Sequence, residues 1–260
     1  MDFHDKYHQN LRVLLCGCLA AVLIACAPPQ DSRNDRAQAQ STDTNLAAAP
    51  NAELPTAEPE ETLPPIDPFE AAEVAFENAV NLMAEDKFRE AIPQLKKSLE
   101  FDDQNEEAHY RLAFAFARIQ QPEEAIKHYR STLELTPDYA EAHNNLGNLL
   151  MRKGDLPAAT THFNKAIEIA PDIASAHNNL GTVLSRQTRI NKAIPHFVKA
   201  LELDPGYVEA HCNLGNAYLF QKRAQEAAET FQRALQIRPG FPHAIKGLQR
   251  AQAQLTTSPL

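Results

Sequence analysis

Apolar residues from Ala72 onward recur with a period of 34, through five consecutive units without a gap. Within each unit, apolar residues follow one another at spacings of three and four, which predicts amphipathic helices. Positions are numbered from the first residue of each unit. Each unit has room for two such helices. The units are residues 72–105, 106–139, 140–173, 174–207 and 208–241.

Four columns of residues explain how the two helices of a unit would pack. Position 8 is always Ala or Gly, and position 20 is always Ala, which permits a close antiparallel approach. Position 24 carries a large side chain that fills the space beside them, and position 32 carries Pro in four units, which ends the second helix. In position order the columns are Ala79, Ala113, Gly147, Gly181 and Gly215; Ala91, Ala125, Ala159, Ala193 and Ala227; Leu95, Tyr129, Phe163, Phe197 and Phe231; and Asp103, Pro137, Pro171, Pro205 and Pro239.

This pattern resembles the tetratricopeptide repeat (TPR) family over residues 72–241. The resemblance implies an all-α fold, a superhelix (α-solenoid) of five helix-turn-helix repeats in which stacked neighbours share one core. Residues 242–255 read as an amphipathic helix that caps the last repeat, and residues 256–260 form a short tail.

The N-terminus has the pattern of an export signal. Residues 13–25 form an apolar run that is too short to cross a bilayer comfortably, and Lys6 and Arg12 precede it. The run ends in LIAC, which resembles a bacterial lipoprotein signal. The resemblance implies that residues 1–25 are removed and that Cys26 is lipidated, as with palmitate. Ala27, where an inner-membrane retention signal would have Asp, implies the outer membrane and its periplasmic face. An ordinary signal peptide or an uncleaved anchor is the alternative.

Residues 26–71 are expected to form a disordered tether. Eight prolines lie between Pro28 and Pro68, the segment is rich in Ala and acidic residues, and apolar periodicity is weak. Such a tether would hold the repeats away from the membrane.

Charge limits the range of partners. The chain has a formal net charge of −9, which argues against a nucleic-acid partner. Residues 140–260 carry thirteen bases and nine acids, so this half favours an acidic partner, although solvated helix faces explain the same excess.

Two columns of histidines invite a metal site. Position 4 carries His109, His143, His177 and His211, and position 23 carries His128, His162 and His196. Metal–nitrogen bonds of about 2.0–2.1 Å cannot join members of one column in successive stacked repeats. Packing explains both columns, and we expect neither a metal nor another cofactor.

A row of amides is the better candidate for contact with a partner. Position 6 of the first helix carries Asn145, Asn179 and Asn213, and Asn148, Thr182 and Asn216 follow three residues later on the same face. The TPR resemblance implies that first helices line the concave side. Amides both donate and accept, which suits an extended peptide backbone. The row is similar to the asparagine ladder of eukaryotic O-linked N-acetylglucosamine transferases. Arg111 replaces Asn in the second unit and is expected to take a carboxylate.

These features predict a membrane-anchored envelope lipoprotein that acts as a protein-interaction scaffold, as a monomer or weak oligomer. It resembles envelope lipoproteins of this repeat class that assist pilus or secretion assembly or recruit cell-wall enzymes. Signal, tether, repeats and cap use nearly every residue, so we expect no enzyme. A self-assembling structural protein, and a non-catalytic subunit of an envelope enzyme complex, are the alternatives.

Overall fold

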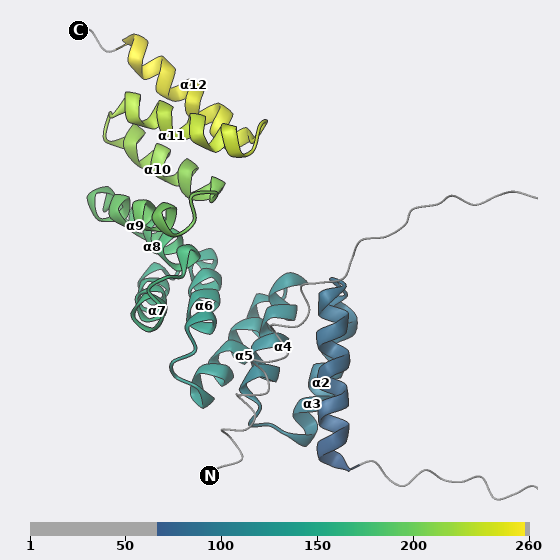
Figure 1. Ribbon diagram of the computed structural model, residues 1–260. Helices are drawn as coiled ribbons and strands as arrows, with labels where there is room; N and C mark the ends of the chain where they lie inside the picture. Colours follow the sequence, from purple (N-terminus) through teal and green to yellow (C-terminus); the bar gives the residue numbers. More distant parts are fainter. Residues whose placement is uncertain (1–66, 258–260) are drawn as a thin grey trace, which may run out of the picture. The chain divides into compact units, whose positions relative to one another are not determined.

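The computed structural model describes residues 67–257, and all of them belong to the compact unit Thr62–Leu260. The predicted signal sequence, the predicted lipidation site at Cys26 and the predicted tether up to residue 66 lie outside the described residues. Figure 1 shows the helices of the described part following one another from α2 to α12.

Within residues 67–257 the structure contains eleven α-helices and no strand. The fold class predicted from the sequence is therefore confirmed. The helices are α2 (Pro68–Ala84), α3 (Phe88–Phe101), α4 (Glu106–Arg118), α5 (Pro122–Leu135), α6 (Ala140–Lys153), α7 (Leu156–Ile169), α8 (Ala174–Arg186), α9 (Ile190–Leu203), α10 (Val208–Phe220), α11 (Ala224–Ile237) and α12 (Pro242–Thr257).

Helix α2 begins four residues before the boundary expected at residue 72. The Asp67 carboxylate accepts a hydrogen bond from the Phe69 amide at 3.0 Å, and Pro68 occupies the first turn, where its missing amide costs nothing. An acidic cap followed by Pro is a start signal that the Pro-rich composition of the preceding segment obscures.

Each repeat turns between its helices through one residue in the left-handed region, always at position 15. Gly154, with φ +89°, fills this place in the third repeat at little cost. The other four repeats place non-glycine residues there with φ near 60°, namely Asp86, Gln120, Thr188 and Lys222. Thr188 is β-branched, so its turn, between α8 and α9, is the most strained of the five.

The helices stack in chain order, and the first helices lie on the inner side of the stack. Helix α8 contacts the first helices on either side of it, α6 and α10, and α10 also contacts α12. Helix α12 therefore takes the place of the first helix of a sixth repeat, with Ala244 and Ala251 fully buried against the fifth.

The core depends on the contact between positions 8 and 24. All five alanines at position 20 are fully buried, and so are Phe163 and Phe231 at position 24. A Cβ atom added to Gly181 would lie 2.7 Å from the Phe197 ring, closer than real contacts allow. The first repeat solves the same problem with Ala79 and the smaller Leu95, both fully buried.

We predict that Gly181→Ala lowers the free energy of unfolding by about 1–3 kcal/mol, because the added methyl group overpacks the Phe197 ring. The loss exceeds the gain in helix propensity, about 1 kcal/mol, that Ala brings over Gly. Urea unfolding monitored by circular dichroism measures the change.

The matched control combines Gly181→Ala with Phe197→Leu, which recreates the Ala79–Leu95 combination of the first repeat. In the Phe197→Leu background the Gly181→Ala substitution should cost less than in the wild type, since the two sites are coupled. An equal cost in both backgrounds would show that the methyl–ring contact does not limit helix approach.

Candidate functional site

The predicted amide row lies on the first helices, where it also links neighbouring repeats. Each position-6 amide donates a hydrogen bond to the position-5 side chain of the preceding repeat. Asn145 Nδ2 donates to Tyr110 Oη at 3.2 Å, and Asn179 Nδ2 donates to Asn144 Oδ1 at 3.1 Å. Asn213 Nδ2 donates to Asn178 Oδ1 at 2.9 Å. These bonds fix the orientation of the amides before any partner arrives.

The second row differs in exposure. Asn148 and Asn216 are exposed, while Thr182 is half-buried and its hydroxyl donates to the carbonyl of Asn178 at 2.9 Å. The three position-6 asparagines are half-buried. The inner face therefore presents exposed amides beside amides that the neighbouring repeat already holds in place.

Arg111 already has an intramolecular carboxylate. Its guanidinium lies 2.7 Å from Glu107 one turn earlier and 5.7 Å from the centroid of the Phe76 ring. Glu107 also accepts a hydrogen bond from Tyr139 Oη at 2.6 Å. Burial and this neighbouring carboxylate raise the pKa of Tyr139, so the phenol stays protonated and donates.

Position 5 is the part of the site that sequence reasoning missed. Tyr110, Asn144 and Asn178 supply the oxygens that hold the amide row, and Tyr110 also packs on Tyr139 with ring centroids 4.8 Å apart. Burial raises the pKa of Tyr110. The signal was weak because the residue type at position 5 changes from repeat to repeat, although every one of these three carries an oxygen.

Comparisons with known proteins decide the family. One tetratricopeptide repeat model matches twice, at residues 138–205 and 172–239. A TPR repeat model matches residues 119–154, and a further tetratricopeptide repeat model matches residues 82–127. Together these matches span residues 82–239, more than half of the chain. The chain belongs to the tetratricopeptide repeat family. A comparison with curated proteins gives no significant match.

Solved TPR structures agree with this fold. YrrB, described as a TPR protein with an unusual peptide-binding site, is 21% identical with a TM-score of 0.58, covering 68% of this chain and 92% of YrrB. MamA is 27% identical with a TM-score of 0.58, covering 65% of this chain and 92% of MamA. PilW, described as a widely conserved type IV pilus biogenesis factor, is 21% identical with a TM-score of 0.62, covering 72% and 90%.

The two histidine columns of the TPR stack face each other within repeats. His109 and His128 bring their Nδ1 atoms to 3.0 Å, His143 and His162 to 2.9 Å, and His177 and His196 to 3.3 Å. The ring centroids of the three pairs are 5.3, 5.2 and 5.6 Å apart. In every pair this separation equals the distance between the Nδ1 atoms plus about one ring radius on each side, so the two nitrogens lie on the line between the ring centres. The nitrogens therefore meet head-on, as in a hydrogen bond, and leave no room for a metal ion between them.

Backbone carbonyls fix which nitrogen of each first-helix ring carries the proton. In the fourth repeat, Nε2 of His177 lies 3.1 Å from the carbonyl oxygen of Pro171, and the other pairs have the same arrangement. Because a carbonyl only accepts, Nε2 donates and Nδ1 of His177 accepts from His196. In a neutral pair, one proton therefore lies between the two Nδ1 atoms. If both rings were charged, two N–H groups would point at each other.

Burial and neighbouring cations oppose protonation of the second-helix rings. The pKa of His128 is lowered to about 4 by burial, then by His109, Lys127 and Lys96. Burial, His143 and Arg130 lower the pKa of His162, and burial followed by His177 lowers the pKa of His196.

The fifth repeat lacks the pair, because position 23 is Thr230, and Nδ1 of His211 is buried without a hydrogen-bond partner among the described residues.

Other chemistry is sparse in the described region. Cys212 is buried, and burial raises the pKa of its thiol to about 11, so it is a poor nucleophile. Residues 67–257 contain no group of three or more His, Cys, Asp or Glu placed to hold a metal ion. Between Asp67 and Thr257, no helix is both long and apolar enough to cross a membrane.

We predict that the TPR stack loses stability as the pH falls from 7 to 5. The pKa of His196 is lower in the folded chain than its ordinary 6.5, so the unfolded chain binds more protons below pH 6.5. Stability is therefore greatest above pH 6.5 and decreases on acidification.

Urea unfolding at pH 7 and pH 5 checks the effect. The control variant, His177→Ala with His196→Gln, places in the fourth repeat the residues that the first repeat carries as Ala75 and Gln94. It should lose part of the stability difference between the two pH values. If the variant and the wild type lose the same stability between pH 7 and pH 5, protonation of His177 and His196 does not contribute to the effect.

Proposed function

We propose that this chain is a lipid-anchored adaptor of a bacterial cell envelope, whose concave TPR face binds an extended protein segment. The repeat architecture itself is that of a protein–protein interaction scaffold. The observation that carries the finer proposal is the amide row, which lies on the inner helices and is held in place from one repeat to the next.

The amide row suits main-chain recognition for a physical reason. Each position-6 amide donates to the preceding repeat, and Asn213 donates to both Asn178 and Thr182 there. An amide also carries a carbonyl oxygen, which can accept a hydrogen bond from a main-chain N–H of the partner. The exposed amides of Asn148 and Asn216 lie one turn further along the same helices. Because the row is fixed before binding, less conformational entropy is lost when the partner is held.

The shared fold is compatible with this use. YrrB, which carries a peptide-binding site, has the same fold, and at 21% identity the comparison extends to the fold alone. The N-terminal part of the proposal rests on the sequence: Cys26 as lipid attachment site, residues 27–66 as tether, and the periplasmic face of the outer membrane as location.

We predict that changing Asn145, Asn179 and Asn213 together to Ala weakens partner binding at least tenfold, because the row that contacts the partner's main chain is removed. Each lost inter-repeat bond should also cost about 0.5–1.5 kcal/mol of stability. The partner would first be isolated from envelope extract on the immobilised full-length chain. Titration calorimetry with the purified partner would then measure its affinity for the wild type and for the triple variant.

Two further variants make the result specific. Asn148→Ala with Asn216→Ala removes only exposed amides, so it should weaken binding without lowering stability. Asn164→Ala changes an exposed asparagine on the second helix α7 and should leave affinity unchanged. Wild-type affinity in the triple variant, with the fold intact by circular dichroism, would rule out the amide row as the contact surface.

A further inference from the structure

The junction between the fourth and fifth repeats differs from the other junctions. Position 13, at the end of the first helix, is Arg in repeats 2, 3 and 4 and Phe220 in repeat 5, where the ring is 65% exposed. Between repeats 1 and 2, the Arg118 guanidinium covers the Phe88 ring at 4.3 Å and pairs with Asp86 at 3.2 Å. A phenyl ring at this place has no charge to pair, so Phe220 remains uncovered.

Two hollows flank Phe220. The groove-side hollow, of about 300 Å³, is lined by Asn213 and Asn216 of the amide row and by Ser185. The turn-side hollow, of about 410 Å³, lies against the strained turn at Thr188. Both hollows share Ile190 and Phe220, so they adjoin at these two apolar side chains.

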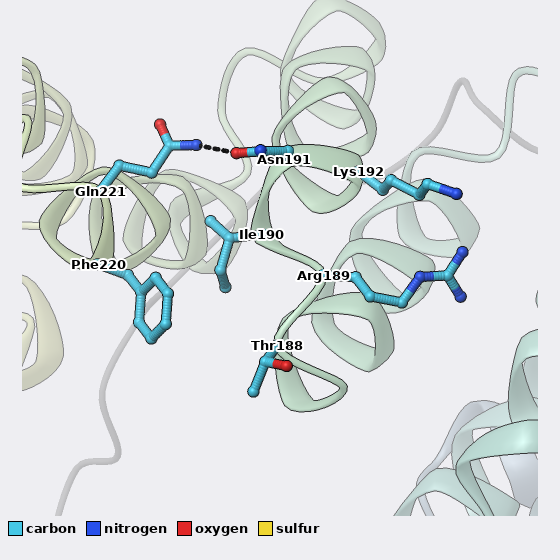
Figure 2. A pocket seen from close by; sticks show the side chains of 7 residues that line it. All are labelled: Thr188, Arg189, Ile190, Asn191, Lys192, Phe220 and Gln221. Carbon is cyan, nitrogen blue, oxygen red and sulfur yellow. Dashed lines mark hydrogen bonds between the residues drawn. The ribbon is translucent and has the colours of Figure 1, made fainter.

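The turn-side hollow is closed on one side by a neutral bond. Figure 2 shows Gln221 donating to Asn191 Oδ1, at 2.6 Å, above the Phe220 and Ile190 side chains. The equivalent junctions of the early repeats carry ion pairs, Arg118 with Asp86 and Lys153 with Glu123. The junction at Phe220 therefore has an apolar floor and no carboxylate of its own.

Basic residues line both hollows. Residues 173–201 contain four basic residues and no Asp or Glu. Lys199 pairs with Glu202, but in the described part of the chain Arg186, Arg189 and Lys192 form no ion pair. In Figure 2 the side chains of Arg189 and Lys192 extend from the start of α9 away from Phe220. In a bound segment, carboxylates that pair with Arg189 or Lys192 must therefore lie several residues away from the side chain that covers the Phe220 ring.

We propose that this junction, the anchor site, selects an acidic extended protein segment with one large apolar side chain, which inserts beside Phe220 and Ile190. The proposal rests on the groove binding proposed above and names its specificity. The segment's main chain lies on Asn213 and Asn216, and its carboxylates flank the apolar side chain. Because an extended chain advances about 3.3 Å per residue, carboxylates a few residues away reach Arg186 on one side and Arg189 or Lys192 on the other.

One buried group supports this path. Ser185 Oγ lines the groove-side hollow, is buried, and has no hydrogen-bond partner among residues 67–257. A carbonyl of the bound segment would accept a hydrogen bond from this hydroxyl. Burying the exposed ring supplies affinity, while the cations select against basic segments.

Fluorescence anisotropy with the full chain tests the anchor site. Three labelled peptides of equal length serve as probes: one with a central Phe flanked on each side by Glu residues after a Gly-Ser spacer, one with Ser in place of Phe, and one with Lys in place of Glu. The acidic Phe peptide should bind at least tenfold more tightly than the other two. Equal binding of the Phe and Ser peptides, or no binding of the acidic Phe peptide, would overturn the proposal.

Matched variants locate the binding. Phe220→Arg installs the residue that repeats 2, 3 and 4 carry at this position, and should make the Phe and Ser peptides bind alike. Arg189→Glu with Lys192→Glu should weaken the acidic Phe peptide at least tenfold. Lys246→Glu with Arg250→Glu makes the same charge change on α12 and should alter binding less than twofold. If this control weakens binding as much as Arg189→Glu with Lys192→Glu, net charge explains the effect and the anchor site is wrong.

The groove proposal is tested separately by Asn145→Ala with Asn179→Ala, since neither residue lines a hollow. Loss of binding in this variant together with wild-type binding in Phe220→Arg would refute the anchor site and retain the groove. The reverse result would retain the anchor site and refute the amide row.

Discussion

The close approach of two helices inside each repeat is the constraint on which the rest of the structure depends. Gly or Ala at position 8 faces the large side chain at position 24, and in the third, fourth and fifth repeats the ring lies so near the glycine that a Cβ atom does not fit. Only this approach buries both apolar stripes. First helices of neighbouring repeats then contact one another on the inner side of the stack.

The inner surface follows from that packing. When first helices of adjacent repeats are neighbours, position 6 of one repeat meets position 5 of the repeat before it, and each position-6 amide is bonded to the preceding repeat. The same antiparallel approach brings position 4 opposite position 23, which creates the histidine pairs. The pairs join the two helices within repeats 2 to 4, while the row lies on the surface that we propose for a protein partner.

The fold could be predicted from the sequence because a period of 34 residues repeats the same physical demand five times. Small residues at positions 8 and 20 allow the two helices to approach, and the large side chain at position 24 fills the space beside them. Together these columns are specific for the helix pair of this repeat. The contacts between columns were harder to predict. The metal-site prediction from the sequence considered only members of the same histidine column in successive repeats. His109 and His128 come from different columns and meet across the helix pair of one repeat, nineteen residues apart. That pairing depends on the turn at position 15, which no spacing rule supplies.

Departures from the repeat were the least predictable and the most informative features. Arg111 was expected to take a partner's carboxylate, yet Glu107 one turn earlier already pairs with it. Phe220 looks like an ordinary apolar residue in the sequence, and only the structure shows that it stands uncovered where other repeats carry Arg. Local chemistry of this kind depends on which side chains a neighbouring repeat brings close.

Site-specific photo-crosslinking tests the central claim, that the inner face of the first helices holds a protein partner, most directly. A photoreactive amino acid would replace Asn148 or Asn216 on that face, and Lys165 or Lys199 on the second helices, in cells that produce the protein. The proposed function predicts adducts from positions 148 and 216 with the same partner and none from 165 and 199. Adducts from the second helices alone would contradict it and move the binding surface to the opposite face.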